Sequence, residues 1–370
     1  MSRRNTSLVK AALTVLHALG ADRAFRMTAA PHGLIYMLHH VEPEAPAEFA
    51  PNRILKITPD FLELVVKETR AAGFDILSLD EAAHRARGAA PQRPFACFTF
   101  DDGYVDNLNY AYPILKKHNV PFTIYITPSF ADGHGDLWWL DLEQAIARAT
   151  SVSITLPTGE RRFETRTVAQ KNACFHDVYW ALRHMPERRA RALVRALAEQ
   201  VGYNAVETTK RLPMTWDELR ALNQDPLVTL GAHTVHHLAL AKLSDREAFV
   251  EMEASVLRLE AELGEPCRHF SYPYGDDLSA GAREFRYARK LGMRTGVTTR
   301  KGVLKLCGPN PDLCALHRVS LNGDYQHRRY LRVLMSGLPF QLLHGARSLT
   351  NRVSTVSQLL PTRLVLPPRR

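Results

Sequence analysis

The sequence predicts an α/β fold built on a mainly parallel sheet, either a barrel or a doubly wound sheet. Short apolar runs typical of buried strands alternate with stretches that have helical signals. Several of these runs are followed directly by histidine, aspartate or tyrosine residues. In folds with a parallel sheet, functional sites are built from residues at the carboxyl ends of the strands. The 370 residues, 45% of them hydrophobic, are enough for a sizeable core.

Five apolar runs are predicted to be strands of this sheet. They are LIYML (34–38), FACFTF (95–100), FTIYI (122–126), LVTLGA (227–232) and HFSY (269–272). Capping residues predict where two of the intervening helices begin or end. Thr58 can cap one helix, with Pro59 in its first turn. Ser244 and Glu247 form a capping box for another, which Gly264 ends.

One region breaks the alternation of strands and helices. Residues from about 134 to 212 contain LWWLDLEQAIARA, a hairpin-like SITLPTGERRFET and a basic helix, PERRARALVRALAEQ. This stretch is too long for a plain connection, so we interpret it as an inserted α+β segment. Trp138 and Trp139 within it fit the core of the insertion and a sugar-stacking platform equally well.

Residues 1–30 are interpreted as an N-terminal amphipathic extension. A basic head and an apolar middle are compatible with a signal peptide, but Lys10 and His17 interrupt the apolar run. We therefore favour a helix that is retained. No apolar stretch reaches the roughly 18 residues that a membrane span requires. After about residue 326 the chain turns basic, and 326–370 is predicted to be a peripheral C-terminal tail.

The net charge of +10 and the pI of about 9.5 suit an acidic polymer or peripheral contact with an anionic membrane. A soluble protein with a basic face is the plainer alternative. Because no basic run is interleaved with aromatic residues, nucleic acid is not expected as a partner. The five cysteines are scattered, odd in number and without a CxxC pair, which favours a reducing, cytoplasmic location.

Reactive side chains follow four of the predicted strands. They are His39 and His40, then Asp101 and Asp102, then the histidines of HTVHH (233–237), and finally Tyr274 in YPYG (272–275). The carboxyl ends of parallel strands converge on one face, so we expect these groups to lie together. Alone, Asp-Asp-Gly is usually a turn, and His39 and His40 would more often be core or loop residues.

A carboxylate with two histidines is a usual ligand set for catalytic zinc. His233 and His237 are four apart, so a helical turn would place both on one side, with His236 on another. Asp101 and Asp102 diverge in extended backbone, so one can hold the metal while the other faces the substrate. A bound metal lowers the pKa of its water, and the second carboxylate can take the proton.

With TFDDG (99–103), HTVHH and YPYG, the chain resembles the polysaccharide deacetylases, the family-4 carbohydrate esterases, over roughly 31–325. These include chitin, poly-N-acetylglucosamine, peptidoglycan and nodulation-factor deacetylases. The resemblance implies a deformed (β/α) barrel of about seven parallel strands as a catalytic domain, interrupted by the insertion. It implies metal-dependent hydrolysis of the N-acetyl group of an amino sugar in an oligo- or polysaccharide.

The resemblance also assigns roles to single residues. Asp101 matches the family's general base, and Tyr274 the residue whose backbone N–H helps to bind the oxyanion. Asp102, His233 and His237 match the ligands of the metal, for which Zn²⁺ is expected. MLHHV (37–41) resembles the early catalytic histidine of the permuted branch, so His39 is the candidate acid. His317 in ALHRV is a second candidate.

The chain departs from the family in one important place. Where many members have Arg-x-Pro-Tyr, it has Ser271-Tyr272-Pro273-Tyr274, so the arginine that steadies the base is missing there. Arg268 or Arg318 could substitute. The tryptophan-bearing fourth motif of the family has no clear counterpart. A glycoside hydrolase, which would leave the histidines unexplained, and a non-catalytic carbohydrate-binding protein with a vestigial site are the alternative functions.

Overall fold

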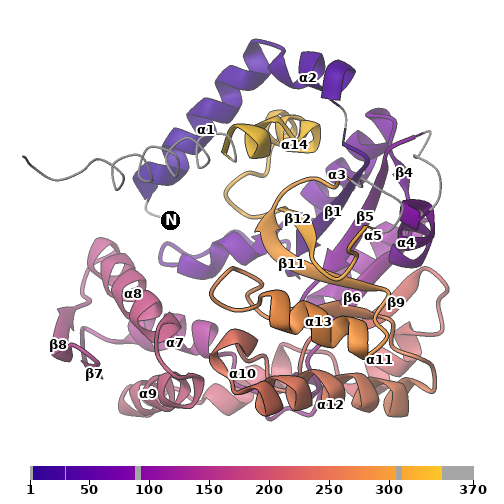
Figure 1. Ribbon diagram of the computed structural model, residues 1–370. Helices are drawn as coiled ribbons and strands as arrows, with labels where there is room; N and C mark the ends of the chain where they lie inside the picture. Colours follow the sequence, from indigo (N-terminus) through magenta and orange to yellow (C-terminus); the bar gives the residue numbers. More distant parts are fainter. Residues whose placement is uncertain (1–2, 30, 88–92, 306–310, 344–370) are drawn as a thin grey trace, which may run out of the picture.

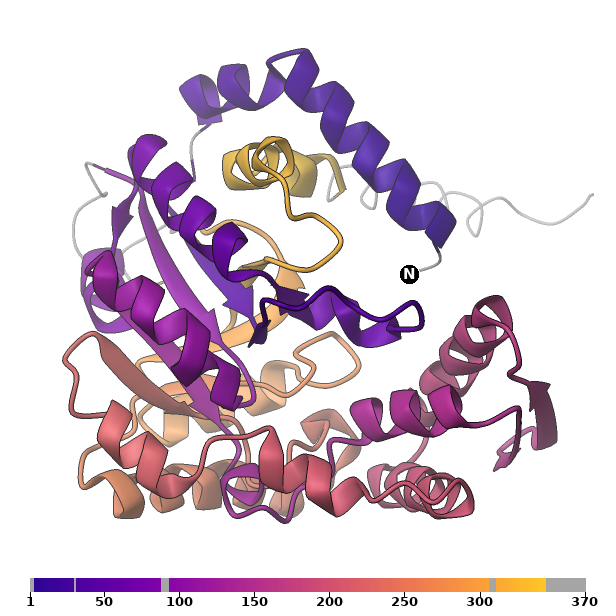
Figure 2. The ribbon, with the colours of Figure 1, turned by 180° about the vertical axis from the view of Figure 1, so that it is seen from behind.

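The computed structural model describes residues 3–29, 31–87, 93–305 and 311–343. Seven parallel strands form a closed barrel in the order β1, β12, β11, β10, β9, β6 and β5, and β5 pairs back to β1. An eighth strand, β4, pairs with the beginning of β5 outside the ring. Helices surround the barrel (Figures 1 and 2). The predicted deformed (β/α) barrel is therefore confirmed.

The five predicted strands are present within one residue of their expected ends. The barrel strands are β1 (Gly33–Leu38), β5 (Phe95–Phe100), β6 (Phe122–Ile126), β9 (Val228–Ala232), β10 (His269–Ser271), β11 (Thr295–Lys301) and β12 (Leu316–Ser320). Outside the ring lie β4 (Asp75–Ile76) and a parallel pair, β2 (His40–Val41) with β3 (Lys56–Ile57). The sequence did not single out β11, whose Thr- and Gly-containing start and basic end give no apolar run.

The capped helices form as their end residues predict. Thr58 accepts a hydrogen bond from Phe61 N at the start of α3 (Pro59–Ala71). Ser244 and Glu247 make a capping box on α12 (Asp245–Leu263), and Gly264 ends it in the left-handed conformation. The other helices around the barrel are α4 (Leu79–Arg87), α5 (Tyr112–Lys117), α6 (Pro128–Ala131), α11 (Trp216–Leu222) and α13 (Ala282–Lys290), with short turns η1 (Pro51–Leu55), η2 (Asn107–Ala111) and η3 (Leu240–Lys242).

The segment between β6 and β9 builds a hydrophobic core of its own. It contains α7 (Trp138–Arg148), the antiparallel hairpin β7 (Ser151–Leu156) and β8 (Gly159–Glu164), α8 (Val168–Arg183), α9 (Glu187–Gln200) and α10 (Ala205–Arg211). Trp138 and Trp139 are both buried in this core. The insertion lies to one side of the barrel (Figure 1). The structure thus places the two tryptophans in the core and not on an open platform.

The N-terminal helices α1 (Arg3–Ala18) and α2 (Ala21–Ala29) arch over α14 (Arg328–Ser336) in both views (Figures 1 and 2). Helix α14 in turn packs against α3. The first residues of the predicted C-terminal tail are therefore helical and packed, and 344–370 lie outside the described residues. Within the described part of the chain, none of the helices is long and apolar enough to cross a membrane.

Candidate active site

The reactive residues sit where barrel strands end. His39 directly follows β1, and Asp101 and Asp102 directly follow β5. His233 directly follows β9, and Tyr274 comes three residues after the end of β10. Side-chain contacts link these groups across the barrel mouth. The expectation that four strands deliver their reactive side chains to one place is met.

Asp101 is held inside the barrel by a buried arginine. Arg318, from β12, donates to both of its carboxylate oxygens, at 2.8 Å to Oδ1 and 2.6 Å to Oδ2. The remaining guanidinium N–H groups reach Thr298 O, Thr99 Oγ1 and Ser271 Oγ. Every N–H donor of the guanidinium therefore has an acceptor. Burial raises the pKa of Asp101, but the charge and hydrogen bonds of Arg318 lower it by more, and Asp101 stays ionised.

The same network accounts for the serine at position 271. Ser271 Oγ donates to Asp101 Oδ1 at 3.1 Å and accepts from Arg318. A small side chain on β10 leaves the space beside Asp101 to the arginine that comes from β12. Of the two arginines considered from the sequence, Arg318 makes the contact. Arg268 precedes β10 and lies at the opposite end of that strand from Tyr274.

Asp102 meets the two outer histidines of HTVHH. Its Oδ1 lies 3.5 Å from His233 Nε2 and 3.3 Å from His237 Nε2, and all three side chains are buried. Among the described residues, Asp102 Oδ1 has no hydrogen-bond partner of good geometry. One ligand atom from each residue falls within 4.8 Å of the others. Burial raises the pKa of Asp102, but the two imidazoles lower it by more, to well below its ordinary value.

The donor set of this cluster fits a divalent metal. His233 Nδ1 is 2.6 Å from Ser271 O, and because a carbonyl only accepts, Nδ1 carries the proton. The lone pair of His233 Nε2 then faces Asp102. A backbone carbonyl on the far nitrogen is the usual way in which a metal-ligating histidine is oriented. Asp102, His233 and His237 are thus the residues that could hold such a metal in this structure.

The backbone around the cluster is strained. Among the described residues, five other than glycine have positive φ, and four of these belong to the site: Asp102 (74°), Thr234 (61°), His237 (54°) and Tyr274 (59°). Such conformations cost about 1–3 kcal/mol each and persist where surrounding contacts enforce them. The predicted helical turn at 233–237 is wrong. The segment is a loop, and its left-handed residues, not helical spacing, turn both histidines toward Asp102.

The two candidate acids lie in different surroundings. His39 Nε2 is 3.8 Å from Asp101 Oδ2, and its side chain keeps 18% of its surface exposed. Burial lowers the pKa of His39 below its ordinary value, and Asp101 partly offsets this. His317 neighbours Arg318 in β12, so its side chain points to the other face of the strand. There it packs against Gly302, where a Cβ atom would come within 2.7 Å of His317 Nδ1.

A second group of acidic and histidine side chains lies beside His39. His40 Nδ1 is 2.6 Å from Asp106 Oδ2, and Glu42 pairs with Lys56 at 2.8 Å. The His40 ring stacks on Tyr104 with 3.6 Å between ring centroids. The carboxylates of Asp106 and Glu42 already have partners. We therefore interpret this group as a structural one that stabilises the barrel mouth.

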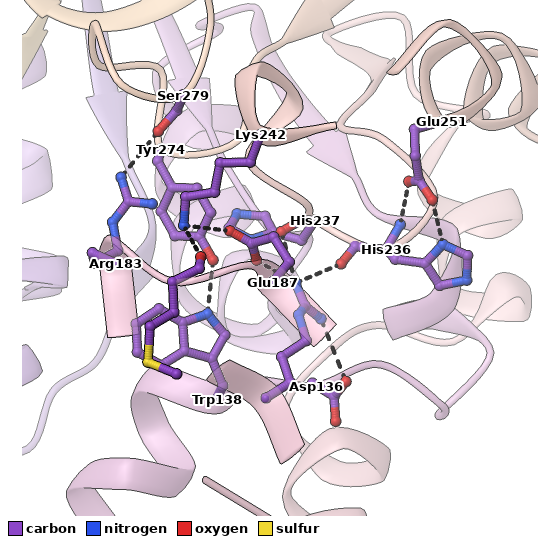
Figure 3. A network of polar contacts seen from close by, with 12 residues as sticks. Asp136, Trp138, Arg183, Glu187, His236, His237, Lys242, Glu251, Tyr274 and Ser279 are labelled. Carbon is purple, nitrogen blue, oxygen red and sulfur yellow. Dashed lines mark hydrogen bonds and ion pairs between the residues drawn. The ribbon is translucent and has the colours of Figure 1, made fainter. Parts of the chain in front are cut away.

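The insertion packs directly onto the site. The Trp139 and Tyr274 rings lie 4.9 and 4.7 Å from the His237 ring. Trp138 Nε1 donates to Tyr274 Oη at 2.7 Å, and the Arg183 guanidinium lies 3.9 Å from the centre of the Tyr274 ring (Figure 3). Arg183 also binds Asp276 and Ser279, in the segment after Tyr274. These contacts fix the loop that carries Tyr274.

Arg191, from α9, holds the loop that carries His237. Its Nη2 donates to the carbonyls of His236 and His237 at 3.0 and 2.9 Å, and Asp136 lies 3.4 Å from its Nη1. On the outer side of the loop, Glu251 accepts from the backbone N–H of Val235 and of His236, each at 3.1 Å. Figure 3 shows its contacts with His236. The strained loop is therefore bonded on both sides.

Sequence reasoning did not find Arg183 or Arg191 as site residues. Both come from the insertion, far along the chain from the strands they support. The helix that contains Arg191 is rich in arginines, and helical spacing gives no reason to choose one of them. The contacts with the His237 and Tyr274 loops exist only because the insertion folds back over the barrel.

A parallel barrel with a carboxylate–histidine cluster and a second, arginine-bound carboxylate defines a hydrolase-type site. The sequence model of the family named polysaccharide deacetylase matches residues 88–296, more than half of the chain. The chain belongs to the polysaccharide deacetylase family. The matched region contains Asp101, Asp102, His233, His237 and Tyr274, whereas β1 with His39 and β12 with Arg318 lie outside it.

Solved structures show the same fold. A Streptococcus pyogenes deacetylase, PplD, in complex with acetate, is 19% identical, with a TM-score of 0.54, and the match covers 82% of this chain and 97% of that one. IcaB from Ammonifex degensii is 17% identical, with a TM-score of 0.51 and coverage of 82% and 98%. No curated protein matches the sequence. Family and fold together support an enzyme that hydrolyses amide bonds and deacetylates a polysaccharide.

Arg191→Ala should weaken zinc binding about 10- to 100-fold, because loss of a partner that orients metal ligands typically costs that much. Competition with a chromogenic chelator would measure this affinity. Arg195→Ala is the matched control, since Arg195 also binds Asp136, at 2.8 Å, but forms no hydrogen bond with residues 233–237. Its zinc affinity should stay within about twofold of the wild type. Equal losses in both variants would contradict the role of Arg191.

Proposed function

We propose that this protein is a metal-dependent deacetylase that hydrolyses the N-acetyl group of an amino sugar in an oligo- or polysaccharide. One observation carries the proposal. Two adjacent aspartates have separate partners, Asp101 with Arg318 and Asp102 with His233 and His237. This division supplies an ionised base beside a three-residue metal cluster. A general base beside a bound metal is a combination that can hydrolyse an unreactive amide.

Asp102, His233 and His237 would hold the divalent metal, with zinc as the best match to one carboxylate and two imidazoles. When bound, the metal would polarise the acetyl carbonyl and lower the pKa of the attacking water. His233 Nδ1 is already occupied by Ser271 O, so the ring presents Nε2 to the site without reorganisation.

Asp101 would take the proton from the attacking water. Arg318 and Ser271 hold its carboxylate in one orientation and keep it ionised. In the family, the arginine for this task comes from the position that Ser271 occupies here. We propose that Arg318 does the same work from β12, which reaches Asp101 from another side of the barrel.

His39 would protonate the departing amine. Its Nε2 lies 3.8 Å from Asp101 Oδ2, so a proton removed from the water has a short path to the imidazole and then to the sugar nitrogen. The backbone N–H of Tyr274 would bind the oxyanion of the tetrahedral intermediate. The positive φ of Tyr274 and the packing of Arg183 and Trp138 on its side chain keep this part of the backbone in place.

Acetate release tests the proposal directly. The purified protein should release acetate from at least one of chitooligosaccharides, poly-N-acetylglucosamine and peptidoglycan. Removal of metal by dialysis against a chelator should abolish release, and added Zn²⁺ should restore it, because the polarising cation is required. Acetate is measured enzymatically and new reducing ends colorimetrically. Reducing ends without acetate would indicate a glycoside hydrolase, and binding without either product would indicate a vestigial site.

Substitutions of the two aspartates should have different effects on metal content and on turnover. Alanine at Asp102, His233 or His237 should lower metal content, which elemental analysis measures. Asp101→Asn should keep the metal but lose about 10²–10⁴-fold in kcat, because a general base is removed. An Asp101→Asn protein that arrives without metal, or one with near-normal turnover, would contradict this division of roles.

Substrates with different leaving groups distinguish the two candidate acids, His39 and His317. His39→Ala should cripple hydrolysis of an N-acetyl sugar but affect an activated aryl acetate much less, because a phenolate departs without protonation. Its metal content should be unchanged. His317→Ala is the control and should show no selective loss, since His317 lies on the other face of β12. Equal losses on both substrates in His39→Ala would remove the acid role from His39.

A further inference from the structure

The apolar side chains of α1 cover a wider arc of the helix than the part that is buried inside the protein. Leu13 is buried against Tyr330 and Val333 of α14, and Val9 and Leu16 pack beside it. These contacts dock α1 on α14. The apolar residues beside this inward face are exposed and are not part of that cluster.

The outward face carries a stripe of large apolar side chains. Leu8, Val15 and Leu19 are 63%, 56% and 76% exposed. Their spacing of seven and four residues places them along one line of α1 and of the turn that begins at Leu19, and the exposed Ala12 lies between Leu8 and Val15. Single exposed leucines are ordinary on protein surfaces, whereas apolar side chains that gather in a contiguous patch are typical of interaction surfaces. We call Leu8, Val15 and Leu19 the apolar stripe.

The charge around the stripe has one sign. Asp22 is the only acidic residue in the two helices, and it is fully buried, with its Oδ2 3.6 Å from His17 Nδ1. Arg23 and Arg26 of α2 form no ion pair with any described carboxylate, and Lys10 lies on the other side of α1 from the stripe. The exposed charges of α1 and α2 are therefore all positive. Met27 of α2, 87% exposed, adds a further apolar side chain.

We propose that the outer surface of α1 and α2 docks on an anionic lipid bilayer. An aligned apolar stripe with cationic neighbours is the pattern of an interfacial helix, which lies in the headgroup region without crossing the membrane. A second copy of this chain is a poor occupant, because two surfaces with only positive exposed charge repel each other. Both views place α1 and α2 at the periphery of the molecule, where a flat surface can reach them (Figures 1 and 2).

Vesicle sedimentation with the full chain tests this proposal. The wild type should sediment with vesicles of phosphatidylcholine and phosphatidylglycerol, bind pure phosphatidylcholine weakly, and be released by high salt. Leu8→Glu/Val15→Glu should lower the partition coefficient by about tenfold or more, because it places charge in the apolar stripe. Arg23→Glu/Arg26→Glu should weaken binding to the anionic vesicles alone.

Val250→Glu/Leu257→Glu on α12 is the matched control. These two residues have the same spacing as Leu8 and Val15 and are 49% and 58% exposed. This variant should bind like the wild type. Thermal unfolding and acetate release from a soluble oligosaccharide show that each variant is folded. No binding by the wild type, or equal binding by the stripe variant, would overturn the proposal. So would a wild-type oligomer that the stripe variant turns into a monomer.

Discussion

The ion pair between Arg318 and Asp101 is the interaction on which the site depends. Burying a guanidinium and a carboxylate is expensive, and the pair is tolerable only when all of its polar groups are satisfied. Here that condition ties β12 to Thr99 and Asp101 of the β5 segment, Thr298 of β11 and Ser271 of β10. Such a pair adds little net stability compared with apolar packing, but in the observed arrangement of strands all of its donors have acceptors. The direction of Asp101 is fixed by the same arrangement.

Because Arg318 binds Asp101, the neighbouring Asp102 can have different partners. The chain turns into the left-handed region at Asp102, which sends its carboxylate to His233 and His237 and not to the arginine. Two neighbouring carboxylates in one low-dielectric site would normally repel, and one of them would bind a proton. Separate positive or metal-binding partners remove that conflict. Both carboxylates can therefore remain charged.

The insertion is part of the site although it has its own core. Its arginines and tryptophans hold the His237 and Tyr274 loops, whose positive φ values make them costly to form. The strained residues lie at the ends of barrel strands, and contacts from α7, α8 and α9 stabilise their loops. An insertion between β6 and β9 thus does more than lengthen a connection. It supplies the surface on which the strained loops of His237 and Tyr274 pack.

The sequence by itself determined the features that local interactions control. Apolar runs marked five of the seven barrel strands, and Thr58, Ser244 and Gly264 marked helix ends, because burial on both faces and capping depend on near neighbours. The positions of Asp101, Asp102, His233 and His237 at strand ends also followed, since parallel strands end on one face. Local spacing failed at 233–237, where left-handed backbone replaced the predicted helical turn.

Only the tertiary structure decided which distant residues meet. Arg318 reaches Asp101 across 217 positions of sequence, and no local pattern separates it from Arg268. The same holds for Trp138 and Trp139, whose burial depends on how the insertion folds, and for His39 and His317, whose directions depend on barrel closure. A contact of this kind is chosen by the packing of whole strands and helices. Periodicity and capping report only on residues within a few positions of one another.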